Sequence, residues 1–281
     1  MLESSRRPED ERCAHFILGM RVDATNYDAA RGVIMDWALR GESRCVCEAP
    51  INMVMEAYDH PRFRECINAA DLVTPGGMPI VWLMRLLGVR RQPRVYGPEL
   101  MLRVCEAAAQ ANVPVGFFGG TAEVACDLVR HLELRYPGLP AVFVYSPPFR
   151  SLTAHEDKEI CAAIASSGCR ILFVGLGCPK QERWMAAHRG RIQAVMLGVG
   201  AAFDFISGHK PQAPLWLQRA GGEWLFRLAT EPSRLWRRYV YHNPRFVVLA
   251  AWQSLRWWRR RPMTDGCAEV DIKQESCVRR S

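Results

Sequence analysis

The sequence lacks several features that would place a protein in a familiar class. Its longest runs without a polar residue, such as Ala194 to Phe203, have 10 residues and two glycines, whereas a membrane-spanning helix needs roughly 20 apolar residues. The first twelve residues are charged and contain no apolar core, so they predict no secretory signal. The sequence also contains no HExxH, DxD, CxxC or GxxxxGKS/T motif, which excludes a P-loop and predicts no metal site.

Disulfide bonding has equally little support. The eleven cysteines are odd in number and scattered along the chain. This pattern is typical of reduced cysteines that serve as small core residues, and it predicts a cytoplasmic protein. With 49% hydrophobic and 23% charged residues among 281, the composition excludes intrinsic disorder and is sufficient to bury a full core in one or two domains.

The positive charge is concentrated near the C-terminus. Between Arg219 and Pro262 the sequence has ten arginines, no lysine and two acidic residues. This segment therefore accounts for the whole formal net charge of +8, and it also carries five of the nine tryptophans. Because clustered charge says more about partners than the overall balance does, we interpret the segment as a basic, aromatic appendage on a neutral body.

The pattern of apolar residues divides the chain into four parts. We predict a flexible leader (1–12), an α/β core (13–218), a helical basic appendage (219–262) and a flexible tail (263–281). Short apolar runs in the core predict strands at His15–Leu18, Arg44–Ala49, Asp71–Thr74, Val113–Phe118, Ala141–Tyr145, Arg170–Val174 and Ala194–Leu197. Amphipathic stretches predict helices at Asn26–Leu39, Pro61–Ala69, Met78–Leu87, Pro98–Ala111, Ala122–Tyr136, Ala154–Ser167 and Lys180–His188. This alternation is typical of a Rossmann-like α/β fold, a parallel-rich sheet with helices on both faces.

Glycines follow several of the predicted strands, where parallel sheets bind ligands. They lie at Gly76-Gly77, Gly119-Gly120, Gly175–Gly177 and Gly198–Gly200. Such loops let a backbone approach an anion at a helix N-terminus, so together they predict a diphosphate site; each one alone is equally compatible with a tight turn. Neither Gly-x-Gly continues into GxGxxG, which argues against a dinucleotide. The triplet Lys180-Gln181-Glu182 offers a cation, an amide and a carboxylate, although Lys180 could also be a solvated surface lysine.

At these loops the sequence resembles the WecG/TagA/CpsF glycosyltransferase family, over roughly residues 15–250. The matching stretches are RVYGPELM (94–101), GFFGGTAEV (116–124), YSPPF (145–149), VGLGCPKQERW (174–184), GVGAAFDFISG (198–208) and EWLFRLATEPSRLWRRY (223–239). Members of the exopolysaccharide type look most similar. The resemblance implies an inverting transfer without metal or other cofactor, from a UDP-sugar donor to a polyprenyl-diphosphate-linked saccharide acceptor, with the appendage covering the active site at the membrane.

The resemblance also implies roles for individual residues. Arg94 matches a catalytic arginine that supports the diphosphate, and Gln181 matches an active-site glutamine. Arg227, Arg234 and Arg237 match arginines of the family's appendage that reach substrate phosphates. Alternatively, these three arginines form only a solvated helix face. Guanidinium groups suit this chemistry because one guanidinium can donate two parallel hydrogen bonds to the oxygens of a phosphate. The other expected substrate-binding residues are Gly119, Gly120, Thr121, Gly175, Gly177, Pro179, Lys180, Glu182, Gly200 and Asp204.

One departure from the family pattern concerns the general base. The family usually has TxN after the second strand and PDG after the third, where the aspartate is the expected base. This sequence has Glu48-Ala49-Pro50 and Pro75-Gly76-Gly77 instead. We predict that Glu48 replaces the missing carboxylate, since an inverting transfer needs one near the acceptor hydroxyl; Asp204 is a weaker candidate. The alternative is a catalytically impaired scaffold that still binds sugar nucleotides.

The appendage predicts an anionic membrane surface as a partner. Tryptophans and arginines alternate in it, a combination suited to the headgroup region. Nucleic-acid binding would leave the glycine-rich loops unexplained, so we predict no nucleic acid. The expected location is the cytoplasmic face of the membrane, with peripheral attachment, and a homo-oligomer stays possible.

Overall fold

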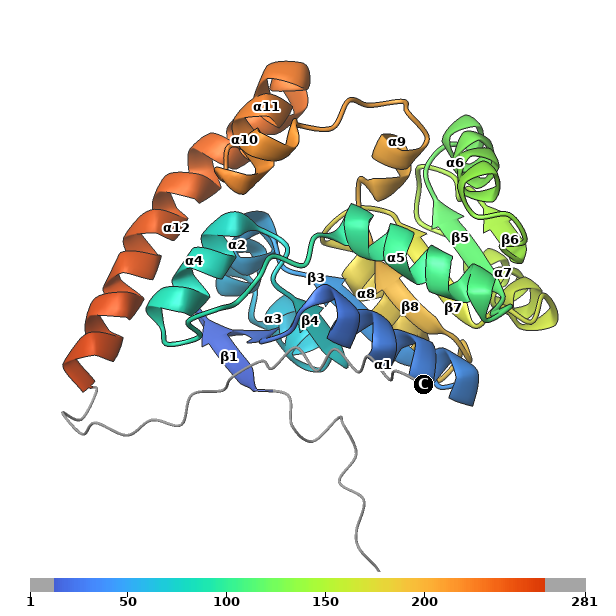
Figure 1. Cartoon of the computed structure of the whole chain (residues 1–281), viewed down its shortest axis with the longest axis horizontal. Coiled ribbons are helices and arrows are strands. Elements are labelled where there is room, and N and C mark those ends of the chain that lie inside the picture. Colours follow the sequence, from blue (N-terminus) through green and yellow to red (C-terminus); the bar gives the residue numbers. More distant parts are fainter. Residues whose placement is uncertain (1–12, 261–281) are drawn as a thin grey trace, which may run out of the picture.

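The computed structural model describes residues 13–260 and centres on one parallel sheet (Figure 1). The sheet has six strands in the order β4-β3-β8-β7-β5-β6. Their bounds are β3 (Arg44–Glu48), β4 (Leu72–Thr74), β5 (Val115–Gly119), β6 (Ala141–Tyr145), β7 (Ile171–Gly175) and β8 (Val195–Gly198). Two short strands, β1 (Ala14–Ile17) and β2 (Met20–Asp23), form a separate antiparallel hairpin.

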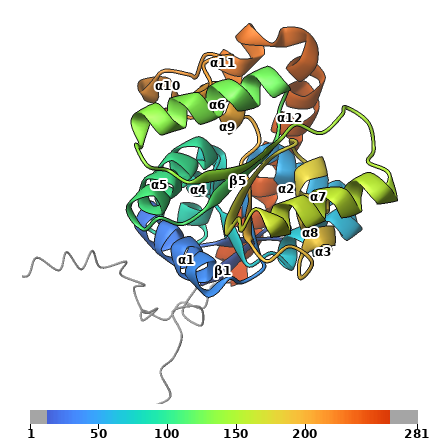
Figure 2. The same ribbon diagram turned by 90° about the vertical axis from the view of Figure 1, so that its right-hand side faces the viewer.

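Alternating side chains of the strands bury one hydrophobic cluster on each face of the sheet. In β7, Ile171 and Phe173 pack into one cluster, whereas Leu172 and Val174 pack into the other, as the twofold repeat of a strand requires. The first cluster is covered by α1 (Tyr27–Arg40), α5 (Gly97–Gln110), α6 (Ala122–Arg135) and α9 (Ala202–Ile206). The second is covered by α2 (Ile51–Asp59), α3 (Pro61–Asn68), α4 (Met78–Leu86), α7 (Ala154–Ser166) and α8 (Lys180–His188). Figure 2 shows α1 and α5 on one side of the sheet and α7 and α8 on the other.

The C-terminal part of the described chain is helical throughout. It consists of α10 (Leu215–Arg219), α11 (Glu223–Thr230) and the 29-residue α12 (Pro232–Arg260). Figure 1 shows α12, drawn orange to red, running along one side of the molecule beside α2 and α4. Phe246 and Ala250 of α12 belong to the core cluster on that side. Arg245 forms a bidentate ion pair with Asp59 at the end of α2.

The predicted fold class is confirmed: the molecule is α/β, with helices on both faces of a parallel sheet and a helical C-terminal segment. Each predicted strand and helix overlaps a strand or helix of the structure. Four elements, β2, α2, α9 (Ala202–Ile206) and α10 (Leu215–Arg219), were not predicted. The strand predicted at His15–Leu18 exists as β1, but it pairs with β2 and lies outside the main sheet. The predicted leader (1–12) and tail (263–281) lie outside the described residues, and the predicted boundary at 218/219 stays a prediction.

The nine cysteines within the described residues are all free. Four of them are buried: Cys45, Cys47, Cys105 and Cys169. Burial raises the pKa of Cys45 to about 12 and that of Cys105 further still, so these thiols stay protonated and behave as small apolar residues.

Candidate active site

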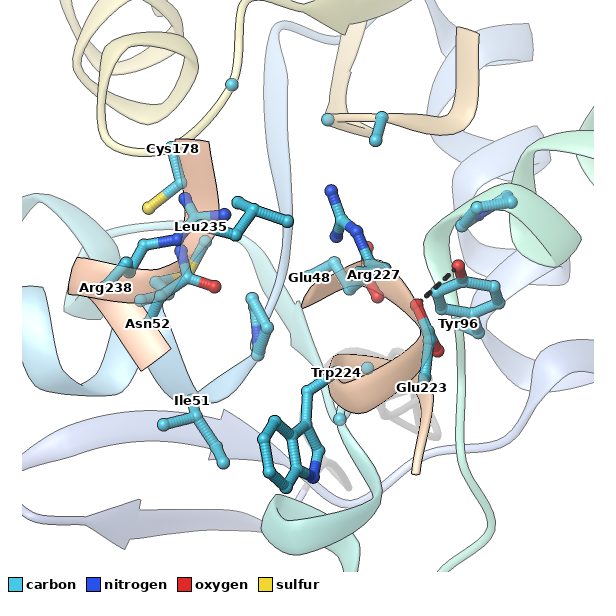
Figure 3. A pocket seen from close by; sticks show the side chains of 18 of the residues that line it. Glu48, Ile51, Asn52, Tyr96, Cys178, Glu223, Trp224, Arg227, Leu235 and Arg238 are labelled. Carbon is cyan, nitrogen blue, oxygen red and sulfur yellow. Dashed lines mark hydrogen bonds between the residues drawn. The ribbon is translucent and has the colours of Figure 1, made fainter. Parts of the chain in front are cut away.

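A pocket of about 470 Å³ lies beyond the carboxyl ends of β3, β4, β7 and β8. The loops after these strands form one wall, and residues of α10, α11 and α12 form the other. Ligand sites of parallel α/β sheets occupy this position. Figure 3 shows the pocket from close by, with Glu48 and Arg227 near its centre.

Glu48 is the last residue of β3 and faces the pocket. Its side chain occupies space that the two neighbouring glycines leave open, because a Cβ at Gly76 or at Gly97 would overlap the Glu48 carboxyl group or Cγ. The depth of Glu48 in the protein raises the pKa of its carboxyl group to about 7, against the opposing effects of Arg94 and the Gly97 N–H. A carboxyl group that ionises near neutrality is suited to accept a proton in catalysis.

Arg94 connects the core to α11. Its Nε donates to the Gly76 carbonyl oxygen, and its Nη2 forms an ion pair with Glu223 at the start of α11. The guanidinium also lies 3.9 Å from the centre of the Tyr96 ring, and the Tyr96 hydroxyl donates to Glu223 at 2.9 Å (Figure 3). These contacts hold Arg94 at the edge of the pocket beside Glu48.

Gln181 joins two of the glycine-rich loops. Its Oε1 accepts hydrogen bonds from the N–H groups of Gly177, at 3.2 Å, and Gly200, at 3.1 Å. Its Nε2 donates to Glu182 Oε1 at 2.6 Å. The Gln181 amide therefore fixes the backbone of both loops where they line the pocket.

Glu182 is 1% exposed and also lines the pocket. Its Oε2 has no hydrogen-bond partner among the described residues, and burial raises the pKa of the carboxyl group to about 7. Cys178 lies close to it, and burial holds the pKa of that thiol well above its usual value. This part of the pocket therefore carries little fixed negative charge below about pH 7.

The opposite wall contributes unpaired hydrogen-bond donors. Arg227 of α11 and Arg238 of α12 each bury an Nε atom that has no partner among the described residues. Nδ1 of His242, which donates or accepts according to the tautomer of the ring, is also buried without a partner among the described residues, and all three side chains line the pocket. A buried donor left unpaired typically costs about 1–3 kcal/mol, so donors gathered around one cavity indicate a site for an anion.

The structure brings together eight of the residues predicted from the sequence. The residues that line the pocket are Glu48, Arg94, Gly177, Gln181, Glu182, Gly200, Arg227 and Arg234. Those that do not line it are Gly119, Gly120, Thr121, Gly175, Pro179, Lys180, Asp204 and Arg237.

Three of the residues outside the pocket make other local contacts. Thr121 accepts a hydrogen bond from the Val124 N–H and so caps α6. Lys180 is exposed, and Asp204 is ion-paired with Lys210 at 2.9 Å. Arg237 is exposed and lies over the Trp236 ring.

Sequence analysis missed several residues that line the pocket. They are Asn52, Tyr96, Glu223, Arg238 and His242. A spacing of four residues places Arg234, Arg238 and His242 on one face of a helix, and that spacing was the available signal. The neighbouring Arg237 was predicted instead of Arg238.

The candidate metal-binding group in the described part of the chain lies outside this pocket. Among the described residues, one group of three side chains, Asp157, Cys161 and His188, is spaced closely enough to hold an ion. None of the three lines the pocket. Arg191 forms an ion pair with Asp157 and also donates to Cys161, which places a cation where a metal would have to bind.

Comparison with known proteins identifies the family. A sequence model described as the glycosyl transferase WecG/TagA/CpsF family matches residues 15–260. The chain is also 32% identical over 194 residues to the N-acetylglucosaminyldiphosphoundecaprenol N-acetyl-beta-D-mannosaminyltransferase of Bacillus spizizenii. That match covers 69% of this chain and 73% of the relative. The resemblance inferred from the loop motifs is thereby confirmed.

Proposed function

The chain belongs to the WecG/TagA/CpsF family of glycosyltransferases, and on this premise we propose that it transfers a sugar from a UDP-sugar to a saccharide linked to undecaprenyl diphosphate. The name of the Bacillus relative, which specifies an acceptor of that kind, supports the choice of acceptor. The observation that carries the proposal is that the Glu48 carboxyl group shares one pocket with the Arg227 guanidinium, whose Nε has no partner among the described residues. They supply the base and the cation that such a transfer needs.

In the proposed reaction, the Glu48 carboxylate accepts the proton of the acceptor hydroxyl. The hydroxyl oxygen then forms a bond to C1 of the donor sugar, while the bond from C1 to the diphosphate oxygen breaks and UDP leaves with the electron pair. Attack from the side opposite the diphosphate inverts the configuration at C1. Arg227 and Arg234 would stabilise the negative charge that develops on the leaving diphosphate.

A screen of UDP-sugars with lipid-diphosphate saccharides tests this function. Formation of a glycosylated lipid with any donor supports a transferase, and the productive donor identifies the sugar. Binding of UDP without product from any donor would instead support the sugar-nucleotide-binding scaffold. The position of Glu48, in the space that an aspartate at position 76 would need, favours the transferase.

Binding of UDP should not require a divalent metal. Arginine side chains supply the positive charge around the pocket, and its lining offers two unpaired guanidinium Nε atoms that can neutralise a diphosphate directly. Calorimetric titration of the protein with UDP should give the same dissociation constant in excess Mg²⁺ and in EDTA. A loss of affinity of tenfold or more on chelation would contradict the metal-free proposal.

The outer face of α12 supports attachment to a membrane surface. Large apolar side chains stay exposed along that face, on the side away from the core: Trp236, Val240, Val247, Val248, Trp252, Leu255 and Trp258. Arginines flank them, and Arg256 lies 3.7 Å from the centre of the Trp252 ring. Within residues 13–260, no helix has the length and apolar character needed to cross a bilayer. We propose that α12 lies in the headgroup region of an anionic leaflet, where cell-surface or exopolysaccharide synthesis would take place.

Replacing both Val247 and Val248 with serine should weaken binding to anionic vesicles about tenfold or more. These side chains are 63% and 68% exposed, so the change removes apolar surface from the membrane contact without leaving a cavity. Sedimentation with vesicles of phosphatidylglycerol checks this. The control is Leu134→Ser on α6, where the leucine is 76% exposed. Equal vesicle binding by the double variant and the control would place the membrane contact elsewhere.

A further inference from the structure

The N-terminus of α2 opens into the pocket without a side-chain cap. Pro50 occupies the capping position and makes no side-chain hydrogen bond, and the first turn contains no acidic residue. Ile51, Asn52 and Met53 of that turn all line the pocket. The Met53 N–H already donates to the Pro50 carbonyl oxygen at 3.1 Å, which leaves the N–H groups of Ile51 and Asn52. Free N–H groups at a helix start carry a partial positive charge that attracts anions. The start of α2 alone is not sufficient for an anion site, which needs a side chain from another element.

The second group comes from α12. Arg238 and His242 lie one turn apart on this helix, line the same pocket, and each bury a nitrogen without a partner among the described residues. Burial lowers the pKa of His242, so at neutral pH its ring is an uncharged hydrogen-bonding group beside the Arg238 guanidinium. Two unpaired nitrogens beside an uncapped helix end are the observation that points to an anionic ligand.

The packing of α12 on α2 explains why these groups meet. Asp59 lies seven residues after Asn52, and Arg245 lies seven residues after Arg238. The bidentate pair between Arg245 and Asp59 fixes the two helices at that point. Both helices rise by the same distance per residue. If α12 runs alongside α2 in the same direction, the contact between Arg245 and Asp59 therefore implies a second one, seven residues earlier in each helix, between Arg238 and Asn52. Figure 3 agrees, with Arg238 and Asn52 together at one end of the pocket.

The charges around this end favour an anion. Glu56 is paired with Arg183 at 3.3 Å, and Asp59 is paired with Arg245. Cys178 lies at the same end (Figure 3), with a thiol whose pKa burial holds well above its usual value. Glu182, close to Cys178, ionises only at about pH 7. Arg238 is therefore the charged group that dominates this part of the pocket.

We propose that the N-terminus of α2, Asn52, Arg238 and His242 form a second diphosphate subsite, separate from the Glu48–Arg227 end of the pocket. This rests on the proposed function, in which both substrates carry a diphosphate. The donor diphosphate is bonded to the reacting carbon and must lie beside Glu48 and Arg227. The acceptor diphosphate is separated from the reacting hydroxyl by a sugar ring. The far subsite therefore fits the diphosphate of the acceptor.

The test compares Arg238→Gln, Asn52→Ala and a control, Arg130→Gln, which removes one positive charge from α6 outside the pocket lining. We expect Arg238→Gln to raise the KM for a short-chain prenyl-diphosphate saccharide about tenfold or more and Asn52→Ala to raise it less. UDP affinity, measured by calorimetry, should change less than about twofold. Arg238→Lys, with circular dichroism and thermal unfolding of each variant, separates loss of the site from loss of the fold.

The other outcomes are equally informative. A tenfold loss of UDP affinity with an unchanged acceptor KM would overturn the proposal, because Arg238 would then bind the donor diphosphate. Unchanged values for both substrates in a folded Arg238→Gln variant would overturn the proposal. Calorimetric titration with inorganic pyrophosphate separates it from the proposed function. If pyrophosphate binding depends on Arg238 but the protein transfers no sugar, the subsite is supported and the proposed function is rejected. If Arg238→Gln transfers sugar normally, the proposed function is supported and the subsite is rejected.

Discussion

Replacing Glu48 with glutamine should lower kcat about 10²–10⁴-fold, the usual contribution of general-base assistance, and leave UDP affinity within about twofold. Glutamine has nearly the same shape as glutamate, so it fills the space beside Gly76 and Gly97 but cannot accept the acceptor proton. A base for the acceptor hydroxyl need not contact the nucleotide. Steady-state kinetics with a lipid-linked acceptor and calorimetric titration with UDP measure the two effects separately.

The pH dependence provides an independent check. The pKa of Glu48 is raised to about 7, chiefly by burial, and only the ionised form accepts a proton. The rate should therefore rise with pH through about 7 in the natural protein, and this rise should disappear in Glu48→Gln. Asp204→Asn is the comparison, because Asp204 is the other candidate base but is paired with Lys210 away from the pocket lining. A wild-type kcat in Glu48→Gln, or an equal loss of UDP binding, would contradict the role of Glu48.

Moving the carboxylate back to position 76 should require two substitutions. Gly76→Asp alone places a side chain in the volume that Glu48 fills, so we expect a loss of stability of about 1–3 kcal/mol from overpacking and little activity. Glu48→Thr alone should lose about 10²–10⁴-fold in kcat. The double variant restores the arrangement that is usual in the family and should recover most of that loss. Thermal unfolding and kcat of the three variants measure the coupling between the two positions.

The choice of threonine follows from the same overlap. Glutamine at position 48 would fill the same space as glutamate and would exclude an aspartate at position 76, so Glu48→Gln with Gly76→Asp should stay inactive. This variant is the matched control for the double substitution. If the double variant Glu48→Thr, Gly76→Asp folds normally but is no more active than Glu48→Thr, an aspartate at position 76 cannot replace the carboxylate of Glu48 as the base.

The fold could be predicted from the sequence because its strands are short apolar runs that end in glycine or at a helix start. ILFVG of β7 and VMLG of β8 are examples. The helix α2 was missed because it has neither a capping side chain nor an acidic residue in its first turn, whereas α8, which also follows a proline, begins with Lys180-Gln181-Glu182. The strand β2 was missed because MRVD has four residues, two of them charged. In both cases tertiary packing, which local sequence does not contain, stabilises the element.

The site could be predicted only where it is built from strand ends. Glu48, Gln181 and Glu182 follow strands whose carboxyl ends must meet, and the structure places all three at the pocket. The arginines of α12 depend instead on how a long helix docks. Neighbouring residues such as Arg237 and Arg238 point about 100° apart around a helix, and the docking of α12 decides which of them lines the pocket.

Two carboxyl groups that ionise near neutrality also determine how the fold responds to pH. Burial raises the pKa values of both Glu48 and Glu182 from 4.5 to about 7. Between these values the folded chain binds more protons than the unfolded chain does. Their contribution to the free energy of unfolding is therefore complete below about pH 4.5 and is lost as the pH rises through about 7, by a few kcal/mol at most for each group.

Acidic groups in ion pairs act in the opposite direction. Arg150 and the Thr153 N–H lower the pKa of Glu156 to about 2, and Arg245 lowers the pKa of Asp59. Their contributions are present above about pH 4 and are lost as the pH falls further. Taken together, these groups place the greatest resistance to unfolding at mildly acidic pH. Glu48 can act as a base only on the alkaline side of that range, so the conditions that favour catalysis are those in which burying its charge destabilises the protein most.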